Sequence, residues 1–94
     1  MTTRNIELFK MIEQLGEGEL TLIIHLYKVK ESNISSLKST LKIGYDKIYN
    51  SLIRLVQYDI VKDETRGKER IIKLSKKGDL IAQKLLEIDK IISS

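Results

Sequence analysis

The stretch from Asn33 to Val61, NISSLKSTLKIGYDKIYNSLIRLVQYDIV, decides how this chain folds. It contains two apolar stripes at helical spacing, the first made of Ile34, Leu37 and Leu41 and the second of Ile48, Leu52 and Leu55. Only Lys42-Ile43-Gly44 separates the stripes, and we expect Gly44 to supply the backbone conformation of a sharp turn. The stretch therefore predicts two short helices joined by a tight turn, which is a helix-turn-helix motif.

The second of these helices, predicted for residues 45–57, has a polar face opposite its apolar stripe. That face holds groups that suit phosphates and base edges: Tyr45, Asp46, Lys47, Tyr49, Asn50 and Arg54. A lysine or arginine matches guanine, and Asn50 matches the donor and acceptor pair of adenine. The alternative is an ordinary solvated face of an amphipathic helix. The sequence favours a surface that reads duplex DNA.

Beyond the motif, the apolar period changes from about 3.6 to two. Two short β-branched runs, Ile60-Val61-Lys62 and Ile71-Ile72-Lys73-Leu74, flank the charged, glycine-containing segment 63–70. They predict a two-stranded β-hairpin with Ile72 and Leu74 facing inward. We expect Arg66, Lys68 and Arg70 to lie at or near its tip.

Helices are predicted on both sides of this central part. Residues 3–15 and 19–30 are amphipathic, and Asn33 and Ser75 are expected to cap the helices that follow them. The helix over 76–92 carries a heptad-like stripe of Ile81, Leu85, Ile88 and Ile92. We interpret this stripe as a dimerisation surface. The alternative is a helix folded back on its own domain.

The order of these elements indicates an α+β, mostly helical fold, a winged helix-turn-helix with a two-stranded wing and flanking N- and C-terminal helices. One domain is expected over 1–94, with an N-terminal helix at 1–17, a core at 19–75 and a C-terminal helix at 76–94. From about Leu20 to Leu86 the sequence resembles winged-helix transcriptional regulators of the MarR/PadR type. The resemblance rests on Asn33 through Ile43, on the apolar positions of helix 45–57, and on Ile72-Lys73-Leu74-Ser75-Lys76-Lys77-Gly78.

The resemblance implies a role for each predicted site residue. It implies that the major groove of DNA faces Tyr45, Lys47, Tyr49, Asn50 and Arg54. It also implies that the backbone or the minor groove is approached by wing 62–70 through Arg66, Lys68 and Arg70. The expected function is sequence-specific binding of double-stranded DNA by a homodimeric transcriptional regulator. Two alternatives stay open, a DNA-coating architectural or plasmid-partition protein and a winged-helix module that binds another protein.

Composition excludes several other classes. The net charge is +4, and residues 44–77 carry nine Lys or Arg against five Asp or Glu, which suits a polyanionic partner. The chain has no cysteine, no phosphate-cradling glycine loop, no nucleophilic set containing histidine and no metal-ligand cluster. We therefore expect no enzyme, no cofactor and no metal. No segment has the apolar character of a signal peptide or a membrane span, so a cytoplasmic protein is expected.

Overall fold

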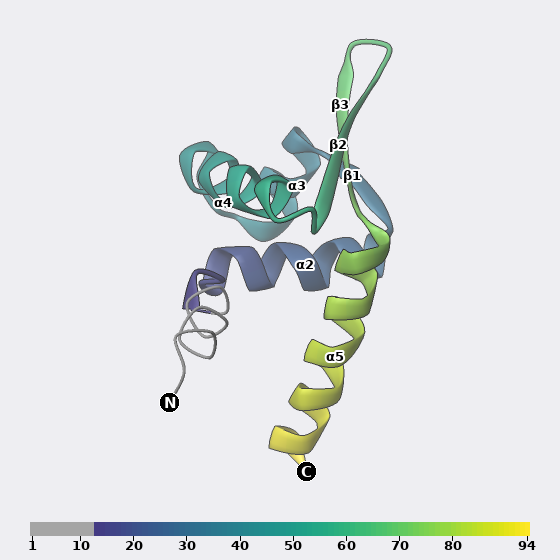
Figure 1. Ribbon diagram of the computed structural model, residues 1–94. Coiled ribbons are helices and arrows are strands. Elements are labelled where there is room, and N and C mark those ends of the chain that lie inside the picture. The colour runs from purple at the N-terminus through teal and green to yellow at the C-terminus, as the bar shows by residue number, and fades with distance from the viewer. Residues whose placement is uncertain (1–12) are drawn as a thin grey trace.

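Helices and a small sheet alternate along the part of the chain that the computed structural model describes, residues 13–94. In chain order the elements are α2 (Glu17–Val29), β1 (Glu31–Asn33), α3 (Ile34–Leu41), α4 (Tyr45–Gln57), β2 (Val61–Arg66), β3 (Glu69–Leu74) and α5 (Lys76–Ser93). The hairpin of β2 and β3 projects away from the helices, and α5 runs in the opposite direction (Figure 1). The winged helix-turn-helix predicted from the sequence is confirmed. The predicted N-terminal helix falls mainly on residues 1–12, outside the described residues.

The sheet has three antiparallel strands in the order β1-β3-β2. The third strand was not predicted, because Glu31-Ser32-Asn33 was interpreted only as a segment that precedes a helix. It pairs along β3, from Glu31 opposite Lys73 to Asn33 opposite Ile71. A strand of three residues is too short to show an alternation of apolar and polar side chains. Its effect is to join the base of the wing to the start of α3.

The wing is longer than the sequence pattern predicted. The strands continue to Arg66 and resume at Glu69, which leaves only Gly67 and Lys68 in the turn. Gly67 occupies the first central position of the turn and has a φ of 62°. A two-residue hairpin turn with a positive φ at that position needs glycine there. The segment 63–70, which was expected to separate the two strands, is therefore mostly strand itself. Beyond the core both faces of the hairpin meet water, so the apolar alternation that identifies a strand is absent there.

The hydrophobic core is centred on α2. The largest side chains with no or almost no exposure are Leu22, Ile23, Leu26, Leu37, Ile48, Leu55, Val61 and Ile72. Helix α2 contacts α4, α5 and β3. In Figure 1, α4 lies beside the N-terminal half of α2, and α5 begins beside its C-terminal end. The core thereby anchors the apolar side of α4 and leaves its other side outward.

The junction between the sheet and α5 depends on Ser75 and Gly78. The backbone N–H of Gly78 donates to Ser75 Oγ at 2.9 Å, which confirms the predicted cap. The same hydroxyl donates to the Asp59 carbonyl at 2.6 Å. A Cβ on Gly78 would lie 2.1 Å from the carbonyl oxygen of Ile60, far inside van der Waals contact. The spacing Ser-x-x-Gly in this sequence therefore has a direct packing reason, because α5 starts against the backbone that leads into β2.

Candidate nucleic-acid interface

The turn between α3 and α4 sets the angle at which α4 is presented. Asn33 caps α3, its Oδ1 accepting from the N–H of Ser36 at 2.8 Å, as predicted. The left-handed residue of the turn is Lys42, with φ 55°, and its N–H donates to the Lys38 carbonyl at 2.9 Å. Gly44 instead has an extended backbone, φ −69° and ψ 156°, which any residue adopts. The expectation that Gly44 makes the sharp turn was wrong, because the chain reverses at the C-cap of α3.

Helix α4 divides into a buried stripe and an exposed face. Ile48, Ser51, Leu52 and Leu55 are buried. At about 100° per residue, the positions farthest from that stripe form what we call the outer ridge: Asp46, Asn50, Ile53 and Gln57. All four are exposed, and Ile53 is 63% exposed. Asn50 was predicted for recognition and Asp46 for the polar face, but Ile53 and Gln57 were missed. Counting the angle from the buried stripe would have found them.

On the side of α4 that faces the wing, two predicted site residues form a continuous stack with cations. The rings of Tyr45 and Tyr49 lie 6.3 Å apart with an interplanar angle of 28°. The ammonium of Lys38, from α3, lies 4.8 Å from the centre of the Tyr45 ring. The guanidinium of Arg70, from β3, lies 5.7 Å from the centre of the Tyr49 ring. Cation–π attraction thus joins α3, α4 and the wing across one surface.

On the opposite side of α4, two other predicted residues face α2. Arg54 Nη1 donates to Glu19 Oε1 at 2.8 Å, although Arg54 was predicted for the outward face. Lys47 passes beside the N-terminal turn of α2, where a Cβ on Gly18 would lie 3.5 Å from its Cε. These two cations therefore border the exposed face of α4, and Arg54 is held by a carboxylate of the body of the domain.

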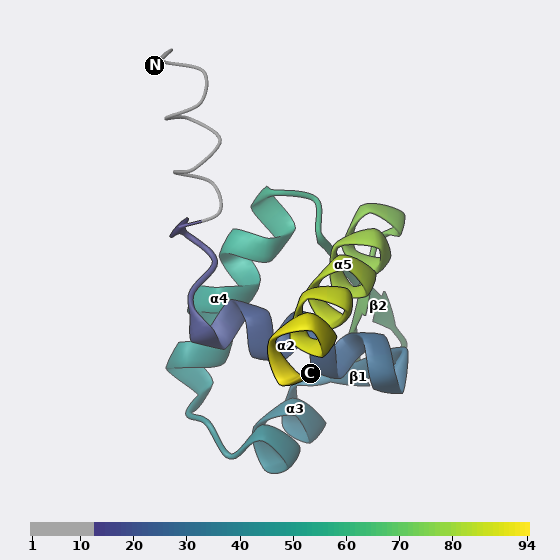
Figure 2. The same ribbon diagram turned by 90° about the horizontal axis from the view of Figure 1, so that it is seen from below.

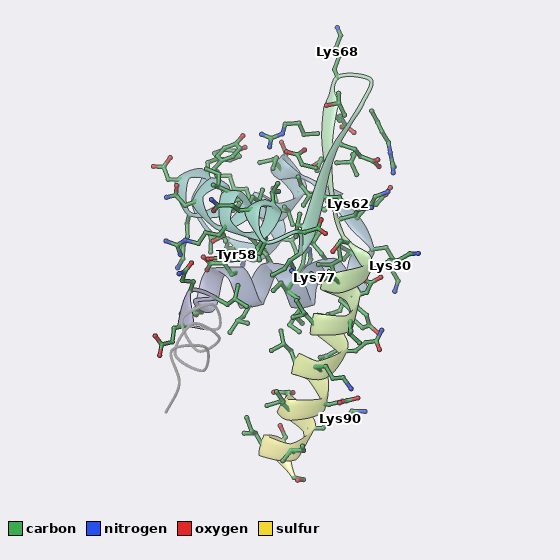
Figure 3. All side chains as sticks on the ribbon, viewed as in Figure 1. Lys30, Tyr58, Lys62, Lys68, Lys77 and Lys90 are labelled. Carbon is green, nitrogen blue, oxygen red and sulfur yellow. The ribbon has the colours of Figure 1, made fainter. Side chains whose placement is uncertain are left out.

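The wing cations are largely paired with carboxylates of the sheet. Arg66 donates from Nη1 to Glu31 Oε1 at 2.7 Å and from Nη2 to Glu31 Oε2 at 2.9 Å, and it also bonds Glu64. Arg70 forms an ion pair with Asp63. Lys68 forms no ion pair with any residue in the described range, and it points away from the tip of the wing (Figure 3). Arg66 and Arg70 lie in the strands but near the tip, as expected, because Arg66 lies opposite Glu69 next to the turn and Arg70 lies opposite Thr65.

These pairs shift the acid–base equilibria of the wing. The hydrogen bond from Arg66 lowers the pKa of Glu31 below its ordinary value, and the same donor, helped by Lys73, lowers the pKa of Glu64. The carboxylates in turn raise the pKa of Arg66, and Asp63 raises the pKa of Arg70. The carboxylates of Glu31 and Glu64 therefore stay ionised at a lower pH than they would in an unfolded chain. A phosphate that approaches Arg66 competes with them.

The structure divides the predicted dimerisation stripe along α5. Ile81 and Leu85 are partly buried and pack against the domain's own core. Ile88 is 52% exposed and Ile92 76% exposed, and Leu80 and Ile91 add further exposed apolar surface. In Figure 1 the C-terminal half of α5 extends away from the other helices, and in Figure 2, which is seen from below, its C-terminal end is turned toward the viewer. Half of the stripe thus follows the folded-back alternative, and the other half is not covered by any of residues 13–94.

Two other kinds of site are absent from the same range. Among residues 13–94, no group of three or more His, Cys, Asp and Glu side chains is arranged to hold a metal ion. None of the helices described for those residues combines the length and the apolar character needed to cross a membrane.

The arrangement of α3, α4 and the wing defines the class of the protein, a winged-helix domain. Its fold is similar to that of solved transcriptional regulators. The transcriptional repressor BigR from Xylella fastidiosa superposes with a TM-score of 0.78 at 20% identity, over 97% of this chain and 91% of that one. A MarR transcriptional regulator from Methanosarcina mazei Go1 gives a TM-score of 0.76 at 24% identity, over 86% of this chain and 57% of that one.

A third solved structure is similar over most of its own length. The transcriptional regulator homologue protein from Pyrococcus horikoshii OT3 gives a TM-score of 0.73 at 18% identity, over 93% of this chain and 94% of that one. No protein-family model matches this chain, and no curated protein does either. At these identities the likeness establishes the shared winged-helix fold.

Proposed function

We propose that this protein is a sequence-specific double-stranded DNA-binding protein that acts as a dimeric transcriptional regulator. The observation that carries the proposal is the orientation of α4, whose apolar side is anchored on the core while its outer ridge faces solvent beside the wing. An α-helix fits the major groove of B-form DNA, and a winged-helix domain offers its second motif helix for that purpose. The fold that this chain shares with transcriptional regulators supports the same function.

The residues of the interface take different roles in this proposal. Asn50, on the outer ridge, reads base edges in the major groove. Tyr45 and Tyr49 donate their hydroxyls to the phosphates beside the groove, while Lys47 and Arg54 approach the backbone from the other side of α4. In the wing, the backbone or the minor groove is contacted by Arg66, Lys68 and Arg70. Lys68 contacts a phosphate without giving up an ion pair, because it alone of the three is unpaired among the described residues.

The proposed homodimer forms through the exposed end of α5. Ile88, Ile91 and Ile92 together make an apolar surface that the described part of this chain leaves uncovered. A second copy related by a two-fold axis would cover it with the same residues. The two α4 helices would then be presented about 34 Å apart, one turn of the duplex. The proposed target is accordingly an inverted repeat.

Selection of bound sequences from a random duplex pool, followed by footprinting of the winners, tests this function. We expect enrichment of one inverted repeat and a single footprint whose extent does not grow with protein concentration. A footprint that spreads along the duplex as the protein concentration rises would indicate a DNA-coating protein instead of a transcriptional regulator. Absence of binding to any duplex at low salt would overturn DNA binding and favour a module that binds another protein.

A further inference from the structure

The outer ridge of α4 has an unusual balance of hydrogen-bonding groups for a DNA-reading surface. Asp46 only accepts hydrogen bonds, Asn50 and Gln57 each offer both a donor and an acceptor, and Ile53 offers neither. None of the four is a pure donor. Guanine presents two acceptors, N7 and O6, in the major groove, and a lysine or arginine matches them best. The ridge is therefore poorly matched to guanine.

The nearest pure donors on α4 lie beside the ridge and are directed away from it. Arg54 donates to the carboxylate of Glu19, a side chain that is only 5% exposed. Lys47 lies against Gly18 in the first turn of α2. Both residues come from the α2-facing side of α4. The centre of the reading surface is thus left to an amide and an aliphatic side chain.

We infer that Asn50 and Ile53 read two neighbouring A·T base pairs, Asn50 through adenine and Ile53 through the thymine methyl group. The inference rests on the proposed function and specifies its substrate. An asparagine amide matches adenine N6 and N7, and an apolar side chain in the major groove matches the C5 methyl of thymine. Ile53 is the most exposed of the large apolar side chains of α4.

The spacing along the helix agrees with neighbouring base pairs. Three residues of α-helix rise about 4.5 Å, and successive base pairs are about 3.4 Å apart. Asn50 and Ile53 are the sixth and the ninth of the 13 residues of α4, so both lie near the middle of the helix. Asp46 accepts a hydrogen bond from the amino group of either cytosine or adenine, so the base that it faces is either of these two.

The test uses base analogues in the half-site that the random pool yields. In the wild-type protein, replacing the contacted thymine by uracil, which lacks only the methyl group, is expected to weaken binding about fourfold. Replacing the contacted adenine by 7-deazaadenine, which lacks the N7 acceptor, is expected to weaken it by about fivefold or more. The same changes at base pairs outside the footprint of α4 should have no effect.

Variants assign each effect to its residue. Ile53→Ala should bind the thymine and uracil duplexes equally, and Asn50→Ala should lose the response to 7-deazaadenine. Val56→Ala and Gln83→Ala are matched controls, because they remove an exposed aliphatic side chain of α4 that lies off the outer ridge and an exposed amide of α5. Both controls should keep the wild-type response to each analogue. All four side chains are exposed, and thermal unfolding monitors whether each variant is folded.

The outcomes separate this inference from the function on which it rests. Selection of a unique site whose α4 positions are G·C pairs would overturn the inference and leave sequence-specific binding intact. Equal affinity of the wild type for duplexes with thymine and with uracil at every position of the site would overturn the role of Ile53 and leave sequence-specific binding intact. Failure to select any sequence would overturn the proposed function itself.

Discussion

Arg54 Nη1 lies 2.8 Å from Glu19 Oε1, and this contact joins the helix that presents the interface to the central helix of the core. The Glu19 side chain is nearly buried, whereas Arg54 is half exposed. A buried carboxylate without a partner is unfavourable, so the arginine stabilises the placement of α4 on α2. The residue most like a base-reading arginine in the sequence thus also has a role in the fold.

Replacing Arg54 should therefore reduce stability. We expect Arg54→Ala to lower the free energy of unfolding by about 1–2 kcal/mol, because the loss of a charge-assisted hydrogen bond is moderated by the exposure of the arginine. Urea denaturation measures the change. Lys62→Ala, which removes an exposed cation without an ion pair in the described range, should change it by less than about 0.5 kcal/mol. Equal effects of the two variants would contradict a structural role for the contact.

Two glycines should respond to substitution in opposite directions. Gly78→Ala should destabilise the protein by about 1–3 kcal/mol, since the new Cβ would collide with the Ile60 carbonyl. Gly44→Ser should stabilise it by about 0.5–1 kcal/mol, because Gly44 has an extended N-cap backbone, no side-chain cap and open space within 4 Å of where a Cβ would lie. Thermal and urea unfolding of both variants measure the contrast. A stabilised Gly78→Ala variant would contradict the tight junction at α5.

Releasing Arg66 from its carboxylates should strengthen DNA binding. The double variant Glu31→Gln, Glu64→Gln removes both charges that hold this guanidinium. We expect higher affinity for duplex DNA and a log–log salt slope steeper by about 0.9, which corresponds to one more neutralised phosphate. Fluorescence anisotropy over a salt series measures both quantities. Glu87→Gln on α5 is the control, because its partner Lys84 lies outside the interface, and an equal gain there would show a general effect of charge.

The same carboxylates predict how stability depends on pH. Arg66 lowers the folded-state pKa of Glu31 and Glu64 below the ordinary value of 4.5, so their contribution to stability is complete above that value. It should be lost as the pH falls from about 4.5 through the lower folded-state pKa values. Both side chains are exposed, and the effect should be small. Urea denaturation between pH 7 and pH 3 should show a shallower acid loss for the Gln double variant than for the wild type, and identical profiles would argue against the pairing.

The exposed end of α5 predicts the assembly. The double variant Ile88→Glu, Ile92→Glu places two charges in the proposed interface and should yield a folded monomer with weakened binding to an inverted repeat. Light scattering coupled to size-exclusion chromatography measures the mass. Gln83→Glu, a change at another exposed position of α5, should leave the dimer intact. A dimer that survives the double variant would remove this end of α5 from the interface.

The fold was predictable from sequence where apolar periodicity and capping agree. The stripes of α3 and α4, the caps Asn33 and Ser75, and the extent of α5 all follow local rules that operate within one element. Strand β1 and the outer part of the wing were missed for a common reason. Neither has a face buried against the core along its whole length, so no alternation marks them in the sequence.

The interface was predictable in kind but not in detail. The sequence identified α4 and its polar side, yet the direction taken by a long side chain depends on neighbours that are distant in the chain. Arg54 meets Glu19, 35 residues earlier, and Arg66 meets Glu31, also 35 residues earlier. Ile53 was missed because a singly exposed isoleucine is common on protein surfaces and gains meaning only once the angle of the buried stripe is known.

The stack from Lys38 through Tyr45 and Tyr49 to Arg70 bears on the thermodynamics of association. Aromatic rings and long cationic chains that already restrain one another have little rotamer freedom left to lose when a duplex arrives. Complex formation should then carry a smaller entropic penalty than a surface of independent lysines and arginines would impose. Calorimetry on a Tyr45→Ala protein should detect the difference as a less favourable entropy of binding.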